Sequence, residues 1–354
     1  MKKIDLYITL KFIKSFFLGL LAFLNIFILS TLFKVVGYII DGKLSLKNGM
    51  IYLGAGLPDV IVNVVPLAVL LGGLMTVNKM AASSEIIALK TSGISFFRIV
   101  FMPLMFSAII SIGVFWFNDS VVPKANKLKR EKIYDVKEAR IKTDIYMKGS
   151  QDNLYYISMI NGSSATINNI MILIMNKGFS KIEKVLIAER GIYNIKEKKW
   201  ELENVILSDN ISGNEQKFQK YDAKFIGETP EDFLRDKIRE NELSINELQE
   251  TVKFLGKTGG DIKKLLAALY KKSAYPFAAL VMSFIGLSLG SRYVRGASAV
   301  SIGLSVVIGY SYYVVMATIE AFSIGGFLNP FLGAWIPNMI FLTVGIYTMR
   351  NAEY

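Results

Sequence analysis

The polar side chains best suited to act on another molecule lie in residues 83–95, between two apolar runs of membrane-spanning length. Ser84 can cap the N-terminus of a short helix, Glu85 is favoured by the dipole of its first turn, and Gly93 can close its C-terminus. The apolar residues of the segment recur at helical spacing, as Ile86 and Leu89. We therefore expect a short amphipathic helix, placed where a soluble partner could exert force on it.

Enzymatic chemistry has few residues to work with in this chain. The sequence contains no histidine and no cysteine, which excludes disulfides, thiolate zinc sites and histidine general bases. A serine–lysine protease is the one mechanism left, and Lys79 lies near Ser83 and Ser84 in the sequence. No spacing fixes either serine against that lysine, so helix capping is the favoured interpretation.

Nucleotide binding has one weak candidate, Gly256-Lys257-Thr258, which resembles the end of a phosphate-binding loop. Thr251 stands where that motif needs its first glycine, so the segment is better explained as a helix end followed by a basic residue. The sequence shows no other nucleotide-binding motif. We expect no catalytic activity and no cofactor in this chain, so that any ATP and Mg²⁺ would be bound by a partner.

The elements that position these residues are mostly membrane spans. The chain has 354 residues, of which 52% are hydrophobic, and its mean hydropathy is +0.40. Charged residues avoid six windows of roughly the 20 residues needed to cross a bilayer. These windows predict a polytopic α-helical membrane protein with six spans: 15–33, 60–78, 99–118, 273–291, 296–319 and 321–349.

Basic residues predict the orientation of the spans. Lysines precede the first span, and basic residues also mark the loop at 79–98, the turn at 291–296 and the C-terminus. The positive-inside rule therefore places both termini and residues 84–95 in the cytoplasm. The formal charge of +12 is explained by these flanking residues, so we expect no nucleic-acid partner.

A polar insert with mixed charges separates the third span from the fourth. Its first part alternates apolar residues in short runs, which is typical of an antiparallel sandwich or jellyroll, and its last part turns helical after Thr229-Pro230. Ser244 and Glu247 form a capping-box pattern, and Gly256 is expected to end that helix. The predicted domains are 1–118, a periplasmic β-domain at 119–228, a helical return at 229–272, and 273–354. The predicted strands are 141–146, 154–159, 170–175, 184–189, 192–195, 200–207 and 216–226.

Lys34 is a cation near the outer end of the first span. Such a residue can simply extend its ammonium group to the membrane surface, or it can contact an anionic lipid headgroup. Basic residues just past the third span could extend the same anionic-lipid site: Lys124, Lys127, Lys129 and Arg130.

The order of several short motifs around the insert resembles the lipopolysaccharide-export permeases of the LptF/LptG (YjgP/YjgQ) family, and LptG more closely than LptF. The resemblance covers essentially the whole chain. It rests on Leu57-Pro58-Asp59, Pro66-Leu67-Ala68, Ser84-Glu85-Ile86, Ser92-Gly93-Ile94-Ser95, Val122-Pro123-Lys124-Ala125-Asn126 and Tyr275-Pro276-Phe277-Ala278.

This resemblance implies the membrane subunit of an ABC exporter in the bacterial inner membrane. Its expected partners are two copies of an LptB-like ATPase, a paralogous LptF/LptG subunit, an LptC/LptA-like periplasmic bridge, lipopolysaccharide and membrane lipids. Residues 84–95 would be the coupling helix, with Glu85, Ile86, Leu89 and Gly93 at the ATPase contact. Lipid contacts would come from Lys34, Lys124, Lys127 and Arg130.

The resemblance also implies a route for the lipid, which would enter sideways between a first span and the partner's fifth span. ATP-driven closure would then push it towards the jellyroll, whose free edge could pair with the bridge. Two alternatives stay open. A secondary transporter would need ionisable groups within its spans, and only Lys34 and Glu320 approach that description. A membrane scaffold with a periplasmic sensor domain is the other.

Overall fold

The computed structural model describes most of the chain, and every structural statement below concerns the described residues. These are 2–42, 44–134, 141–149, 153–162, 164–176, 181–194, 197, 199–209, 214–223, 225–230, 233, 239–258, 262–290 and 297–353.

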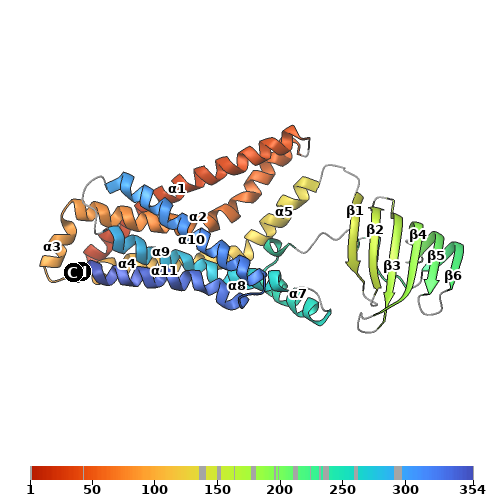
Figure 1. The fold of residues 1–354 in the computed structure, drawn as a ribbon. Coiled ribbons are helices and arrows are strands. Elements are labelled where there is room, and N and C mark those ends of the chain that lie inside the picture. Colours follow the sequence, from red (N-terminus) through yellow and green to blue (C-terminus); the bar gives the residue numbers. More distant parts are fainter. Residues whose placement is uncertain are drawn as a thin grey trace. The chain divides into compact units, whose positions relative to one another are not determined.

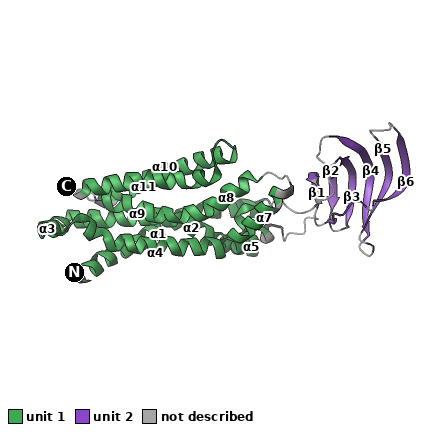
Figure 2. Ribbon diagram, turned by 90° about the horizontal axis from the view of Figure 1, so that it is seen from below, with its two compact units in different colours: residues 1–133, 239–354 green, residues 134–238 purple. Residues whose placement is uncertain are grey.

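The chain divides into two compact units, which Figure 2 colours separately. The helical unit combines Met1–Ile133 with Arg239–Tyr354, and the β unit is Tyr134–Ile238. The helix that follows the third span belongs to the helical unit, because Val122 at its start is buried in the core of that unit. The β-domain predicted from the sequence instead runs from residue 119 to residue 228.

The helical unit confirms the prediction of a polytopic membrane protein. Six described helices are long and apolar enough to cross a membrane: Lys3–Ile40, Leu46–Ala82, Phe96–Arg130, Lys263–Leu289, Ala299–Ile324 and Pro330–Ala352. The elements of the unit, labelled in Figure 1, are α1 (Lys2–Ile40), α2 (Leu46–Ala82), α3 (Glu85–Thr91), α4 (Phe96–Ser120), α5 (Val122–Tyr134), η1 (Glu240–Glu242), α7 (Ile245–Thr258), α8 (Lys263–Ala274), η2 (Tyr275–Phe277), α9 (Ala278–Leu289), α10 (Ala297–Ile324) and α11 (Pro330–Glu353).

Helix α2 lies at the centre of this unit. Its most apolar window is 83% buried, against 17% for the corresponding windows of α1 and α10. Helices α1 and α10 therefore turn large apolar surfaces outward, as helices that face lipid or another subunit do.

Helices α2 and α9 approach closely through glycine. A Cβ on Gly286 would lie 2.5 Å from the carbonyl oxygen of Leu70, and one on Gly290 would lie 2.9 Å from that of Leu74. Gly286 and Gly290 are four residues apart, the small-residue spacing that allows membrane helices to pack backbone to backbone. The sequence alone does not predict this contact, because the two helices that form it lie far apart in the chain.

The β unit contains one antiparallel six-stranded sheet with the strands in sequence order. The predicted β-domain is therefore confirmed, and its described strands follow one another as a meander. The strands are β1 (Ile141–Lys148), β2 (Asn153–Asn161), β3 (Thr166–Met175), β4 (Ile182–Asn194), β5 (Lys199–Asp209) and β6 (Glu215–Ala223).

One face of the sheet forms the core of the β unit. Ile157, Ile170 and Ala188 pair in register across β2, β3 and β4, and all three are buried. Trp200 is fully buried on β5 and donates from Nε1 to the carbonyl of Glu228 at 2.7 Å. The hydrogen bond satisfies the one polar atom of this large side chain.

Two predicted boundaries were wrong. The predicted strands 184–189 and 192–195 leave Gly191 in a break between them, but this glycine lies within β4, where a Cβ would meet the Leu202 side chain at 3.0 Å. Gly191 thus provides space for packing rather than a turn. Gly256 was expected to end its helix, but α7 continues to Thr258.

Candidate functional site

Helix α3 is the short helix predicted between the second and third spans. It runs from Glu85 to Thr91, and Ser83 and Ser84 form the sharp corner that separates it from α2. The predicted capping role of Ser84 was wrong. This residue adopts the left-handed conformation with φ of 60° and makes no side-chain capping bond, because the chain needs this conformation to reverse direction within two residues.

The C-terminus of α3 is closed as predicted. Gly93 has φ of +81°, and its backbone N–H donates to the carbonyl of Lys90 at 2.9 Å, while that of Ile94 donates to Leu89 at 3.1 Å. These two bonds make a Schellman motif, in which a left-handed residue satisfies the last carbonyls of a helix. Leu89 and Ile94 also pack against the core together, which fixes the angle at which the chain enters α4.

The carboxylate of Glu85 is held by three side chains. Lys11 of α1 donates to both of its oxygens at 2.8 Å, Ser83 donates at 2.8 Å and Tyr7 at 3.2 Å. Burial raises the pKa of Glu85, but the hydrogen bonds from Lys11 and Ser83 outweigh burial, so that the pKa lies below its ordinary value. Glu85 is therefore ionised at neutral pH and already paired within its own chain.

The apolar residues of α3 divide between two faces. Ile86 is 6% exposed and belongs to the core of the helical unit, and Leu89 packs partly buried against it. Ile87 is 61% exposed, so it is the large apolar side chain that α3 presents outward. The spacing of Ile86 and Leu89 predicted one apolar face correctly, but Ile87 was missed, because a helix of two turns gives no periodicity from which to choose the outward side.

Two further contacts fasten the ends of this loop. Lys90 donates to the carbonyl of Ala352 in the last turn of α11 at 3.0 Å, a favourable place for a cation because helix C-termini carry partial negative charge. Arg98 in the first turn of α4 pairs with Asp5 of α1 at 2.8 Å. Figure 2 places α3 and both ends of the chain at the same end of the helical unit.

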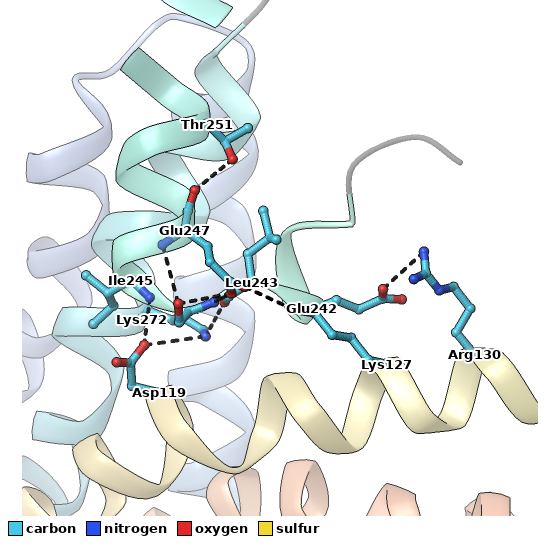
Figure 3. Close-up of polar contacts among 10 residues, drawn as sticks. Asp119, Lys127, Arg130, Glu242, Leu243, Ile245, Glu247, Thr251 and Lys272 are labelled. Carbon is cyan, nitrogen blue, oxygen red and sulfur yellow. Dashed lines mark hydrogen bonds and ion pairs between the residues drawn. The ribbon is translucent and has the colours of Figure 1, made fainter. Parts of the chain in front are cut away.

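The predicted lipid-contact residues fall into two groups. Lys34 and Lys124 are exposed, and in the described part of the chain neither forms an ion pair. Lys127 pairs with Glu247 at 3.1 Å, and Arg130 pairs with Glu242 at 3.3 Å. The structure therefore brings Lys127 and Arg130 together with the helical return, as Figure 3 shows, while Lys34 and Lys124 stay free to meet another molecule.

The helical return is joined to the spans by a polar cluster that the sequence analysis only partly identified. Ser244 and Glu247 form the predicted capping box, with the Ser244 backbone N–H donating to the Glu247 carboxylate at 2.7 Å. This bond lowers the pKa of Glu247, burial opposes it, and Lys127 lowers the pKa further. The backbone N–H of Ile245 donates to Asp119 at 2.7 Å, and Lys272 donates to the carbonyl of Leu243 (Figure 3).

A polar cavity of about 360 Å³ lies between these elements and the spans. Two ion pairs line it, Lys271–Glu320 at 2.7 Å and Lys264–Glu240 at 2.9 Å. Asp59 and Asn63 of α2 line it as well. The cavity can hold water or a polar group. Among the described residues, no cluster of three acidic side chains could hold a metal ion.

The fold and this site define an α-helical membrane protein with six spans, a β domain inserted between the third and fourth, and an anchored short helix between the second and third. The sequence matches the family described as "Lipopolysaccharide export system permease LptF/LptG" over residues 6–351. The chain therefore belongs to the LptF/LptG family of lipopolysaccharide export permeases.

Individual relatives agree with the closer resemblance to LptG. The permease protein LptG of Haemophilus influenzae is 22% identical over 321 residues, which cover 88% of this chain and 87% of that protein. LptG of Escherichia coli is 21% identical over 347 residues, covering 93% and 94%. LptF of Escherichia coli is 29% identical over 114 residues, covering 31% of each chain.

Proposed function

We propose that this chain is the LptG-like transmembrane subunit of an ABC exporter in the bacterial inner membrane. It extracts lipopolysaccharide from the outer leaflet and passes it to a periplasmic bridge, using ATP hydrolysed by a separate protein. The observation that carries this proposal is the family match from residue 6 to residue 351, a range that includes α3, the β unit and nearly all of the six spans.

The proposed assembly contains two LptB-like ATPase subunits, which bind ATP and Mg²⁺, and a paralogous permease subunit of the LptF type. Both termini and α3 lie in the cytoplasm, and the β unit lies in the periplasm. An LptC/LptA-like bridge extends the sheet by pairing with an edge strand. Such pairing is supported by the meander order of the strands, because β1 and β6 each have only one neighbour among the described strands.

Helix α3 is the proposed contact for the ATPase. Glu85 supplies charge, Gly93 sets the end of the helix, and Ile86 and Leu89 fix α3 on the core so that a displacement of the helix moves the spans behind it. This division of roles is supported by the burial of Ile86 and by the exposure of Ile87.

Lipid contact is proposed for the exposed cations Lys34 and Lys124, whose ammonium groups can reach phosphate groups. Lys127 and Arg130 can also contribute positive potential. Their ion pairs with Glu247 and Glu242 support a structural role for these two side chains before a role in lipid contact.

A secondary transporter is the second candidate, because the cavity lined by Asp59, Lys271 and Glu320 places ionisable groups beside the spans. That protein would work without an ATPase and would depend on a proton or ion gradient. The two candidates differ in what the chain binds, which gives the test.

The test is purification of the tagged chain from its native membrane, with bound proteins and lipopolysaccharide measured together. We expect the wild type to bring down an ATPase and a paralogous permease, and Glu85→Lys to lose the ATPase. Glu250→Lys is the matched control, since this glutamate is exposed on α7. A wild-type chain that purifies without any ATPase, and shows activity dependent on a gradient, would refute the exporter and support the secondary transporter.

A further inference from the structure

The cytoplasmic-loop helix α3 and the first span are joined by a cluster of charged and polar side chains that come from distant parts of the sequence. Glu85 and Lys11 are 74 residues apart in the chain, and the lysine nitrogen lies 2.8 Å from both carboxylate oxygens. Tyr7, one helical turn before Lys11, donates to the same carboxylate, and its ring lies 4.2 Å from the Lys11 nitrogen. One turn of α1 thus provides two donors for a single carboxylate.

The Lys11–Glu85 pair is partly exposed, and its lysine is carried by backbone that packing holds in place. The two side chains are 30% and 29% exposed, so that solvent screens them only in part. Ile8 and Phe12, which directly follow Tyr7 and Lys11 in the sequence, are buried in the core of the helical unit. The backbone that carries Lys11 is therefore held in place by packing, and the ion pair needs little ordering of α1 to form.

A second ion pair joins the same part of α1 to the other end of the loop. Asp5 pairs with Arg98 in the first turn of α4 at 2.8 Å. The two ion pairs have opposite polarity, since α1 provides the cation that binds Glu85 and the anion that binds Arg98. Consequently α1 is attached to the beginning of α3 and to the helix that follows it.

We infer that Lys11 is a positioning residue through which a displacement of α3 is transmitted to the first span. Helix α1 is continuous from Lys2 to Ile40, so a movement imposed on its first turns reaches its opposite end. Tyr7 supports the lysine, and the Asp5–Arg98 pair keeps α1 and α4 aligned during the movement. This inference rests on the proposed function, in which an ATPase acts on α3.

The inference separates two properties that a simple docking role would join. Lys11→Met should leave the ATPase bound, because it keeps Glu85 and the exposed Ile87 on α3, but should lower the amount of lipopolysaccharide extracted per ATP hydrolysed. An ion pair worth about 1 kcal/mol corresponds to a change of about five-fold in an equilibrium constant. We therefore expect the amount of lipopolysaccharide extracted per ATP to fall by about five-fold. Lys11→Arg should restore the ratio, since a guanidinium group can bind both carboxylate oxygens. Lys14→Met is the matched control, because Lys14 is exposed one turn further along α1.

The experiment uses the complete complex in proteoliposomes and measures lipopolysaccharide extraction and ATP hydrolysis on the same sample. A structural readout accompanies it. Because the chain contains no cysteine, a pair of spin labels can be placed at Leu10 on α1 and at Thr91 at the C-terminal end of α3, which are both exposed and leave Ile87 unchanged. The distance between them should stay narrowly distributed with and without nucleotide in the wild type, and should broaden in Lys11→Met.

The outcomes distinguish the two proposals. If no ATPase accompanies the wild type, the proposed function fails. If the ATPase binds, but Lys11→Met extracts as much lipopolysaccharide per ATP as Lys14→Met and keeps the narrow distance, then Lys11 does not transmit the movement and the inference is wrong. If Lys11→Met loses the ATPase, Lys11 acts in docking, which also overturns the inference.

Discussion

Replacing Gly286 by alanine tests whether the contact between α2 and α9 limits the stability of the helical unit. The new Cβ would lie 2.5 Å from the Leu70 carbonyl oxygen and 3.2 Å from its carbonyl carbon. Both atoms are backbone, so neither can move aside as a flexible side chain would. The helices must separate, which costs about 1–3 kcal/mol by analogy with other overpacked cores.

The control is Gly303→Ala on α10, where a Cβ would meet nothing within 4 Å in the described part of the chain. Alanine is the better helix former by up to about 1 kcal/mol, and this gain applies to both substitutions. It cancels in the comparison, so Gly286→Ala should be less stable than Gly303→Ala by about 1–3 kcal/mol.

The assay is unfolding of the two purified variants in mixed detergent micelles, followed by circular dichroism as the fraction of denaturing detergent rises. Equal free energies of unfolding would refute the argument, because they would mean that α2 and α9 are not in backbone contact at Gly286.

Three further predictions concern single side chains. Ser84→Gly should stabilise the helical unit by about 1 kcal/mol in thermal unfolding, because glycine adopts the left-handed conformation without the steric cost that serine bears. Trp200→Phe should destabilise the β unit by about 1–3 kcal/mol in denaturant unfolding, since it removes the buried hydrogen bond from the Trp200 indole N–H to the carbonyl of Glu228. Glu247 has a lowered pKa, so its stabilising contribution is complete above the ordinary value of 4.5 and is lost as the pH falls through the lowered value. Stability measured between about pH 3 and 6 should therefore fall less steeply for Glu247→Gln than for the wild type.

Local signals in the sequence were sufficient for the spans, the β domain and several helix ends. The uncharged windows predicted six spans because a bilayer excludes charge regardless of which helices are neighbours. Gly93 and the Ser244–Glu247 pair were predicted correctly since their hydrogen bonds join residues only a few positions apart. Gly191 was misinterpreted because a glycine that gives room to a neighbouring strand looks, in sequence, like a glycine that makes a turn.

Partners distant in the sequence could not be predicted in this way. Nothing near Glu85 indicates that Lys11 binds it, and nothing near Lys127 or Arg130 indicates that acidic residues of the helical return neutralise them. A basic segment beside a membrane has the same sequence pattern whether its charges face lipid or carboxylates. Only the fold brings η1 and α7 against α5, which gives two of the four predicted lipid contacts a structural partner.

The helical unit uses different interactions at its ends and in its middle, and this difference suits the transmission of movement. Helix α3 lies at one end of the helical unit, and α5 and α7 lie at the opposite end (Figure 1). Ion pairs gather at both ends.

Between them, the helices are held by glycine contacts and by neutral hydrogen bonds, such as Tyr275 with Tyr313 and Tyr312 to Asn338. Neutral bonds and close packing avoid burying charge within the bilayer, where it is most costly. Ion pairs at the ends can exchange partners with water, lipid or protein at smaller cost. A displacement that begins at α3 should therefore keep the Lys11–Glu85 and Asp5–Arg98 pairs, move the packed middle as a unit, and rearrange contacts at the end that carries α5 and α7.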